Sequence, residues 1–408
     1  MFTWLQWRSW SRRRIAILAV LLVLAGGSAG AAMWYLRVES HLVSARAAFA
    51  QHDDERARQE LDVYLATWPR CASARLLAAQ TARRLRRYDD ASDHLVVYRA
   101  NGGDPDTIDT EDMLSALQRG VSAMEPLLWK RAEAHDQNEL AILEVLIQHY
   151  IDTYRLHRAL ECLNRYLDQR PDDLHALLGR AFVWERFLQF ADAARDYRTA
   201  VERHPDSDPA RLRLAKTLLI VGTPQEAMEH FQHLVERRPD WPAARLGLAQ
   251  CRRRLDNRAE ARQFLDELIK QQPKYVDALV ERADLALDDG DLATAETSLR
   301  AALKLSPNDR KANYNLYRCL SQLGRDKDAQ ASLAQVERID DNLKRLDQLT
   351  KAVLQSPGDA GLRCQIGLLF LENGEEQEGV RWLQGALTID PHCREAQRGL
   401  AEYLRKKH

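Results

Sequence analysis

Prolines recur at one fixed interval through most of the chain. Five of them are spaced 34 residues apart in unbroken succession, two near the C-terminus repeat the interval, and one near the N-terminus lies in the same phase: Pro171, Pro205, Pro239, Pro273 and Pro307, then Pro357 and Pro391, and Pro69. A single period that recurs this many times indicates that one small structural unit is stacked repeatedly. The chain is therefore predicted to form an elongated array rather than separate globular domains.

A small residue also recurs 12 residues before the last position of each repeat, which is Pro69 in the first repeat, Gly103 in the second and Pro391 in the last. The series is Ala57, Ala91, Ala159, Ala193, Ala227, Ala261, Ala295, Ala329 and Gly379, and only Glu125 breaks it. A small side chain lets one helix pack closely on another, and a proline beyond the helix disfavours helix in the residue before it. Each unit is thus expected to contain two amphipathic helices, with a turn marked by Gly222, Gly290, Gly324 or Gly374 between them.

The period, the small residue and the closing proline resemble the tetratricopeptide repeat, and the resemblance covers essentially everything after Leu36. It implies an all-α fold, a right-handed α-solenoid of helix-turn-helix units, whose first helices line a concave protein-binding groove. The groove positions of that family correspond in this sequence to Gln80, Arg83, Phe182, Lys216, Gln250, Arg253, Asp284, Tyr314 and Arg318. These residues are the candidate sites for a protein or peptide ligand.

The repeat frame divides the chain into successive segments. An array of about nine 34-residue repeats is expected over residues 37–341, a helical extension over 342–357, and a final repeat with a capping helix over 358–408. The third repeat, residues 104–137, is degenerate because Glu125 and Pro126 stand where the small residue and helix should be. It is predicted to be a distorted helix pair or a joint between two sub-arrays.

One long helix is expected near the far end of the array. Neither Gly nor Pro interrupts the chain from Asp326 to Ser356. Within it an apolar stripe alternates three and four residues apart, through Val336, Ile339, Leu343, Leu346, Thr350 and Val353. The stripe either packs on the neighbouring final repeat or forms a ridge for interaction or self-association.

The N-terminal segment has the pattern of a membrane anchor. Residues 15–36 carry no charged side chain and are long enough to cross a bilayer as a helix. The segment 1–14 before them is basic, which predicts a cytoplasmic N-terminus. The array is then expected on the periplasmic or extracytoplasmic side of a single-pass protein of the cell membrane. Cleavage as a signal peptide at Ala29-Gly30-Ala31 is the main alternative, and an arginine pair gives a weaker resemblance to a twin-arginine export signal.

Charge and motif content narrow the functional classes. The 59 basic and 60 acidic residues nearly cancel, which argues against a nucleic-acid-binding protein. Two arginine clusters, at residues 83–87 and 252–254, are interpreted first as solvated helix surface. No phosphate-binding loop, nucleophile elbow or HExxH motif occurs, and the pair His230 and His233 lacks an evident third ligand. The sequence therefore predicts no catalytic residues, no metal and no cofactor.

The six cysteines lie 29 or more residues apart and form no CxxC motif. Most are expected to be buried thiols. Cys364 and Cys393 could pair in an oxidising compartment, but their repeat positions differ and nothing in the sequence brings them together.

Three functional interpretations follow. The leading one is a bacterial, membrane-anchored scaffold or adaptor that is not an enzyme and that binds proteins outside the cytoplasm. The alternatives are a self-assembling structural envelope protein, which would be a homo-oligomer, and a non-catalytic regulatory subunit of an envelope enzyme. Membrane-anchored repeat proteins of lipopolysaccharide control resemble the chain in layout, but their paired CxxC module is absent from it.

Overall fold

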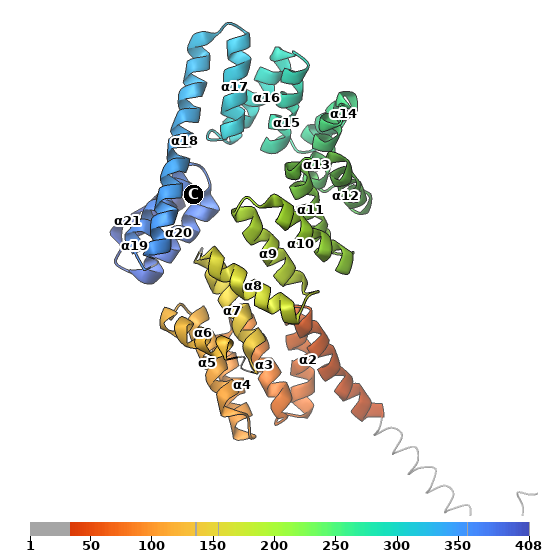
Figure 1. The fold of residues 1–408 in the computed structure, drawn as a ribbon, viewed down its shortest axis with the longest axis vertical. Helices are drawn as coiled ribbons and strands as arrows, with labels where there is room; N and C mark the ends of the chain where they lie inside the picture. Colours follow the sequence, from red (N-terminus) through yellow and green to blue (C-terminus); the bar gives the residue numbers. More distant parts are fainter. Residues whose placement is uncertain (1–32, 135–136, 154, 357, 408) are drawn as a thin grey trace, which may run out of the picture. The chain divides into compact units, whose positions relative to one another are not determined.

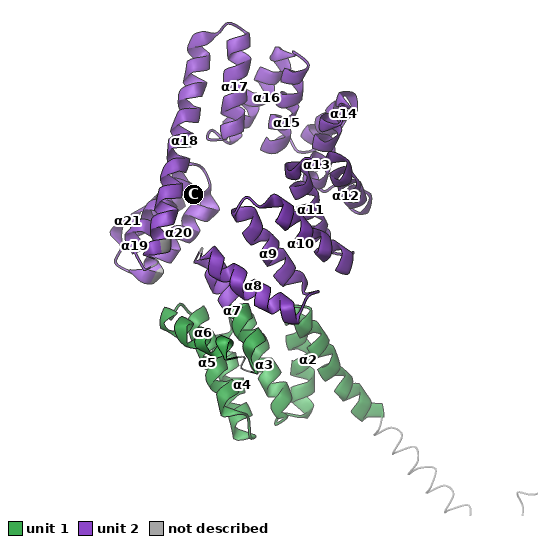
Figure 2. Cartoon of the chain, viewed as in Figure 1, with its two compact units in different colours: residues 1–145 green, residues 146–408 purple. Residues whose placement is uncertain are grey.

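The computed structural model describes residues 33–134, 137–153, 155–356 and 358–407, and within these ranges all regular structure is helical. The chain divides into two compact units, Met1–Val145 and Leu146–His408 (Figure 2). The all-α fold expected from the sequence is confirmed for the described residues (Figure 1).

The first unit begins with a helix over residues 33–50. It continues through α2 (Asp54–Thr67), α3 (Ala72–Arg84), α4 (Tyr88–Ala100), α5 (Pro105–Gln118), the short 3-10 helix η2 (Ser122–Met124) and α6 (Glu125–Glu133). The division between the units falls within α7 (Glu139–Asp152).

The second unit continues as an unbroken series of helices. These are α8 (Leu156–Gln169), α9 (Leu174–Arg186), α10 (Phe190–Arg203), α11 (Asp208–Val221), α12 (Pro224–Arg237), α13 (Pro242–Arg254), α14 (Arg258–Gln271), α15 (Val276–Asp288), α16 (Leu292–Leu305), α17 (Arg310–Gln322), α18 (Asp326–Gln355), α19 (Ala360–Glu372), α20 (Glu376–Ile389) and α21 (Arg394–Lys407). Each helix from α8 to α20 packs on the next in the sequence, as a solenoid requires.

The packing within each repeat depends on the predicted small residues. The alanines of the 34-residue series, Ala57 through Ala329, are all buried, with at most 2% of their surface exposed. The alanines that face them from the first helices are equally buried: Ala45, Ala79, Ala181, Ala215, Ala249 and Ala283. With no side chain beyond Cβ on either side, the two helices approach closely and exclude water along their whole contact.

A left-handed residue ends the first helix of the repeats, and it recurs with the same period. Glycine occupies it at Gly120, Gly222, Gly290, Gly324 and Gly374, whereas His52, Arg86, Leu188 and Asp256 hold positive φ angles at the equivalent places. The next residue then donates its N–H to the carbonyl five positions back, as Thr223 does to Leu218 at 3.0 Å. This is the Schellman arrangement, so the turn is conserved in geometry even where the glycine signal is missing.

Residues 104–137, the third repeat of the sequence frame, depart from the regular helix pair. The second helix of this repeat, α6, has only nine residues and follows the 3-10 turn η2. The buried residues there are Leu128 and Ala132, while Trp129 is only half-buried. The helix begins at Glu125, which stands at the small-residue position of the other repeats, and Pro126 follows it.

Arg84 connects the helices around this distorted repeat. Its guanidinium lies 3.7 Å from the centre of the Phe49 ring and donates to the Phe49 carbonyl at 2.9 Å. It also pairs with Asp54 at 3.4 Å and with Glu144 of α7 at 2.6 Å. Burial raises the pKa of the Asp54 carboxyl, partly against the opposing charge of Arg84. The expectation that Arg83 and Arg84 belong to a solvated basic patch is wrong, because both side chains are almost completely enclosed.

The long helix expected from Asp326 is present as α18, which has 30 residues. Its first half packs on α17 and its second half on α19 (Figure 1). Leu346 and Val353 of the apolar stripe lie in one cluster with Ile366 and Leu369 of α19, while Leu343 remains 43% exposed. The second half of the stripe thus packs against the final repeat, and most of the stripe is not available to bind another molecule.

The predicted membrane segment, residues 15–36, falls mostly outside the described residues, which start at Met33. Within the described ranges no helix combines the length and the apolar character that a bilayer span needs. Met33, Trp34, Tyr35 and Leu36, at the end of the predicted segment, are each at least 50% exposed.

The turn geometry predicts an unusual stabilising substitution. Leu188 holds a φ of 59° and its side chain is 74% exposed, so it strains the backbone without packing on the core. Leu188→Gly should raise the free energy of unfolding by about 0.5–1 kcal/mol, because glycine adopts this φ without strain. Urea unfolding followed by circular dichroism measures the change.

Gly290→Leu is the matched control. A Cβ at Gly290 meets no atom within 4 Å, so any loss of stability arises from its φ of 75° alone. It should destabilise by about 1 kcal/mol. A Leu188→Gly variant no more stable than the parent would mean that the turn carries no strain.

Candidate protein-binding surface

The first helices of three successive repeats line a cavity in the second unit. α11, α13 and α15 contribute most of its wall, and the start of α17 closes one side. The cavity has a volume of about 380 Å³. Lys216, Gln250 and Arg253, three of the predicted groove residues, line it together with the exposed Ile220 and the half-buried Tyr275. The structure therefore brings the central part of the predicted groove together.

A buried polar network forms the floor of this cavity. Gln250 of α13 donates to Glu281 of α15 at 3.2 Å, and Arg253 Nε donates to the other carboxylate oxygen at 2.6 Å. Arg253 also contacts Asp288 at 2.8 Å. The Glu281 carboxylate is almost fully buried, with 2% of its surface exposed. Both of its oxygens accept hydrogen bonds from side chains of α13, so Glu281 links α13 to α15.

The network continues to the following repeat. Lys311 of α17 lies 2.5 Å from a carboxylate oxygen of Asp284, and Asn315 donates to the same residue. The predicted groove residue Asp284 is 8% exposed and is already engaged by these partners. It is therefore a contact between repeats, in contrast to the expectation that it faces a ligand.

The opposite charges of this network stabilise one another's ionised forms. Burial disfavours the charged form of Glu281, but Arg253 and Lys311 outweigh it and hold the pKa of the carboxyl below its ordinary value. Burial likewise acts against the charge of Lys311, and Glu281 and Asp284 outweigh it, which raises the pKa of the ammonium group. The network thus stays ionised at neutral pH.

The first unit contains the same arrangement at the same repeat positions. Gln80 donates to Glu111 at 3.1 Å and Arg83 Nε donates to it at 2.7 Å, from α3 to α5. Arg83 is 1% exposed and pairs with Glu111, so the structure places this predicted groove residue in a contact between repeats. A glutamine, an arginine three residues later and a glutamate in the next repeat form one recurrent link between first helices. That spacing was visible in the sequence, but Glu111 and Glu281 were not recognised from it.

Four of the predicted groove residues remain accessible. Lys216 and Arg318 are exposed, Tyr314 is 44% exposed, and Phe182 is half-buried beneath the guanidinium of Arg186 at 5.2 Å. Lys216 lies in the cavity, whereas the other three lie outside its wall on α9 and α17. A partner can reach these side chains and Ile220, together with the parts of Gln250 and Arg253 that face the cavity.

The second arginine cluster is also not a free basic patch. Arg252 pairs with Glu260 and lies over the Phe264 ring at 4.7 Å, and Arg254 donates to the Leu219 carbonyl. Arg253 belongs to the Glu281 network. The interpretation of this cluster as solvated surface fails for Arg252 and Arg253, which are half-buried against neighbouring helices, whereas Arg254 remains exposed.

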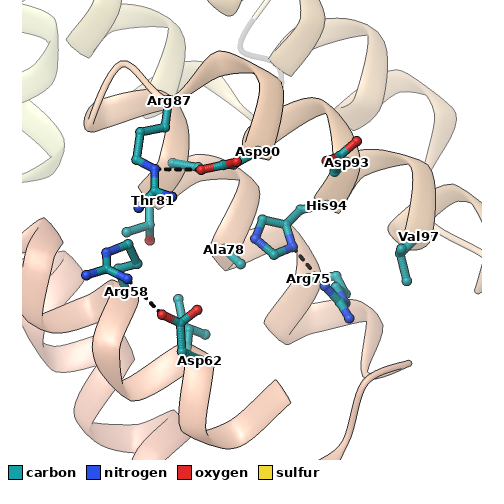
Figure 3. Close-up of a pocket in the computed structure, with 12 residues that line it drawn as sticks. Arg58, Asp62, Arg75, Ala78, Thr81, Arg87, Asp90, Asp93, His94 and Val97 are labelled. Carbon is teal, nitrogen blue, oxygen red and sulfur yellow. Dashed lines mark hydrogen bonds and ion pairs between the residues drawn. The ribbon is translucent and has the colours of Figure 1, made fainter. Parts of the chain in front are cut away.

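A second cavity of about 380 Å³ lies between α2, α3 and α4 of the first unit. Its charged groups pair among themselves, Arg58 with Asp62 at 2.8 Å and Arg87 with Asp90 at 2.5 Å (Figure 3). Arg75 lies 2.9 Å from His94 Nδ1, and burial together with that cation lowers the pKa of His94. His94 is therefore neutral at pH 7, and the cavity is a polar seam between helices.

His230 occupies the same repeat position as His94 and has the same environment. Arg211 lies 3.4 Å from its Nδ1, and burial and this charge lower the pKa of His230. An adjacent cation opposes binding of a metal ion. His230 of α12 thus contacts the preceding helix through Arg211.

Removal of the Glu281 charge should destabilise the second unit. Glu281→Gln leaves Arg253 and Lys311 without their shared anion and is expected to cost about 2 kcal/mol at pH 7. Because the folded-state pKa of Glu281 is depressed, its contribution is present above the ordinary glutamate pKa and is lost as the pH falls through the folded value. Urea unfolding of parent and variant should therefore differ at pH 7 and converge in acid.

Glu378→Gln provides the control, since Glu378 forms an exposed pair with Arg381 three residues away. It should change stability by less than about 0.5 kcal/mol. Equal effects of the two substitutions would show that the buried network contributes no more than a surface pair.

Comparison with known proteins supports the repeat assignment. Two tetratricopeptide-repeat family models match the second unit, one over residues 218–283 and 286–353 and the other over residues 185–242. No curated protein matches the chain.

Solved structures with a similar chain path include a tetratricopeptide repeat protein from Parabacteroides merdae ATCC 43184, at 17% identity and a TM-score of 0.48, over 68% of this chain and 98% of that one. PilW, a widely conserved type IV pilus biogenesis factor, has 20% identity and a TM-score of 0.43, over 49% and 92%. YrrB, a protein with an unusual peptide-binding site, has 17% identity and a TM-score of 0.30, over 51% and 99%. The family models, which cover residues 185–283 and 286–353, lead to the conclusion that this part of the chain is built from tetratricopeptide repeats.

Proposed function

We propose that the chain is a membrane-anchored scaffold that binds a partner protein outside the cytoplasm through the cavity on α11, α13 and α15. The observation that carries the proposal is the cavity itself, which is formed by the first helices of three repeats and bordered by Lys216 and Ile220. Tetratricopeptide-repeat arrays present extended concave surfaces of this kind to other proteins.

The chemistry of the accessible residues defines the class of partner. Ile220 is 57% exposed and Tyr314 is 44% exposed, which offers apolar contact. Lys216 and Arg318 are exposed cations. In contrast, the acidic groups Glu281 and Asp284 are neutralised by Arg253 and Lys311. An extended segment that alternates apolar and acidic side chains is the ligand that fits this distribution.

A non-catalytic role agrees with the chemistry of both cavities. Titratable groups in both cavities are paired with one another, as Arg253 of α13 is with Glu281 of α15 and Arg87 with Asp90 at the start of α4. Tetratricopeptide repeats are typically non-catalytic scaffolds. The proposal therefore assigns binding, and no reaction, to the array.

The anchor rests on the sequence. Residues 15–36 are uncharged and are preceded by Arg8, Arg12, Arg13 and Arg14. The first described helix already exposes Trp34 and Tyr35, whose amphipathic rings favour a membrane interface. Self-assembly is less favoured, because Leu346 and Val353 of the long helix are covered by α19.

Site-specific photocrosslinking in native membranes tests the binding surface. A photoreactive amino acid at Ile220 of the full chain should capture one recurring protein, identified by mass spectrometry. The Lys216→Glu and Arg318→Glu double variant should reduce the yield at least about fivefold, because two interface cations are reversed.

The same amino acid at Leu305, 41% exposed at the end of α16 and outside the cavity, is the matched control. Capture of the same proteins from both positions, or of no protein from Ile220, would count against the cavity as the binding surface. Capture of the chain itself would instead favour a homo-oligomer.

Fractionation tests the anchor. The full chain should remain in the membrane pellet after an alkaline carbonate wash, and protease added from the outside should digest the array. Deletion of residues 1–36 should release it, because the only long uncharged segment is removed. A mature N-terminus at Ala32 would instead identify a cleaved signal peptide and remove the anchor from the proposal.

A further inference from the structure

Two cysteines that are 29 residues apart in the sequence meet in the final repeat. Cys364 lies in the first turns of α19 and is fully buried, and Cys393 directly precedes α21 and is half-buried. Both pack in one cluster with Leu383, Ala386 and Ala396. The Cys393 thiol is close enough to raise the pKa of the Cys364 thiol. The packing of α21 across α19 therefore produces a contact that the sequence did not indicate.

We propose that Cys364 and Cys393 are an oxidisable thiol pair, whose disulfide would clamp the terminal helix α21 to α19. The pair is built into the core of the last repeat, because Cys364 is enclosed and has Cys393 as its thiol neighbour. An oxidant that enters from solvent reaches the half-buried Cys393 first. Cys364 then acts as the resolving thiol.

The reaction needs a two-electron oxidant, either a peroxide or a small-molecule disulfide such as oxidised glutathione. With peroxide, the Cys393 sulfur attacks the O–O bond, which gives a sulfenic acid and water, and the Cys364 thiol then displaces a second water to form the S–S bond. With glutathione disulfide, the Cys393 thiolate forms a mixed disulfide and releases one glutathione, and Cys364 releases the other. Each route removes two electrons and two protons from the pair.

Burial supports this division of roles. Together with the neighbouring Cys393 it raises the pKa of the Cys364 thiol to about 12, so Cys364 is a poor first nucleophile at neutral pH. Thiolate attack from the more accessible sulfur is the step that the environment allows.

Cys71 provides a control within the same chain. It lies two residues after Pro69, as Cys393 lies two residues after Pro391, and it also directly precedes a helix. The residue 29 positions before Cys71 is Leu42, which is buried, in place of a thiol. Cys71 therefore shares the local setting of Cys393 without a resolving cysteine at the equivalent position.

The test uses the full chain, treated with oxidised glutathione and then alkylated in denaturant. Two of the six thiols should be lost together. Trypsin should release the segments 364–381 and 382–394 joined by a disulfide, with a combined mass lower by about 2 Da than the sum of the two reduced peptides. Cys71 should carry either a free thiol or a glutathione adduct, with no internal cross-link.

The variants distinguish a resolving thiol from a bystander. Cys364→Ser should accumulate a stable glutathione adduct at Cys393, and Cys393→Ser should leave Cys364 alkylatable. A stable glutathione adduct at Cys393 of the parent chain, beside an unreacted Cys364, would overturn the proposal. This outcome is measured on the chain without substitutions, so a folding defect of a variant cannot explain it. Amide hydrogen exchange tests the clamp: residues 394–407 should exchange more slowly after oxidation, and equal rates in both forms would refute it.

Discussion

The structure depends on the close approach of the two helices within each repeat. Alanines such as Ala193 and Ala181 meet there with no exposed surface, and larger side chains such as Tyr197 and Phe231 fill the space beside them. The contact tolerates little additional volume: in the final repeat, a Cβ at Gly367 of α19 would overlap the side chain of Leu383 of α20. Because the repeats stack on one another, this spacing sets the position of the first helices, and hence of the cavity that they line.

Polar contacts between repeats then determine which part of the concave surface a partner can use. Glu281 joins α13 to α15 through Gln250 and Arg253, and Glu111 joins α3 to α5 in the same way. Buried ion pairs of this kind contribute little net stability but are costly to break. They link the first helices of adjacent repeats. Polar residues that resemble a ligand-binding site therefore hold the array together. Recognition is left to accessible residues such as Lys216 and Tyr314.

Much of the fold could be predicted from the sequence, because the periodic signals are local. The buried alanine series, the helical turn at Gly222 and the uninterrupted α18 all follow from propensity and spacing within about 30 residues. The candidate site was predicted less well. Arg83 and Asp284 occupy groove positions of the family, yet both are buried against the next repeat. Position in a repeat specifies a face of a helix, but the neighbouring side chains decide whether that face is accessible.

The sequence by itself determined the number and order of the helix pairs, because a 34-residue period and the small residues at its contacts are read along the chain. Tertiary structure alone decided the contacts between residues that belong to different repeats. Arg84 reaches Glu144 past the distorted third repeat, and Cys364 meets Cys393 where α21 crosses α19. These contacts depend on the angle at which one repeat stacks on another. That angle results from the sum of many side-chain contacts, and no single motif encodes it.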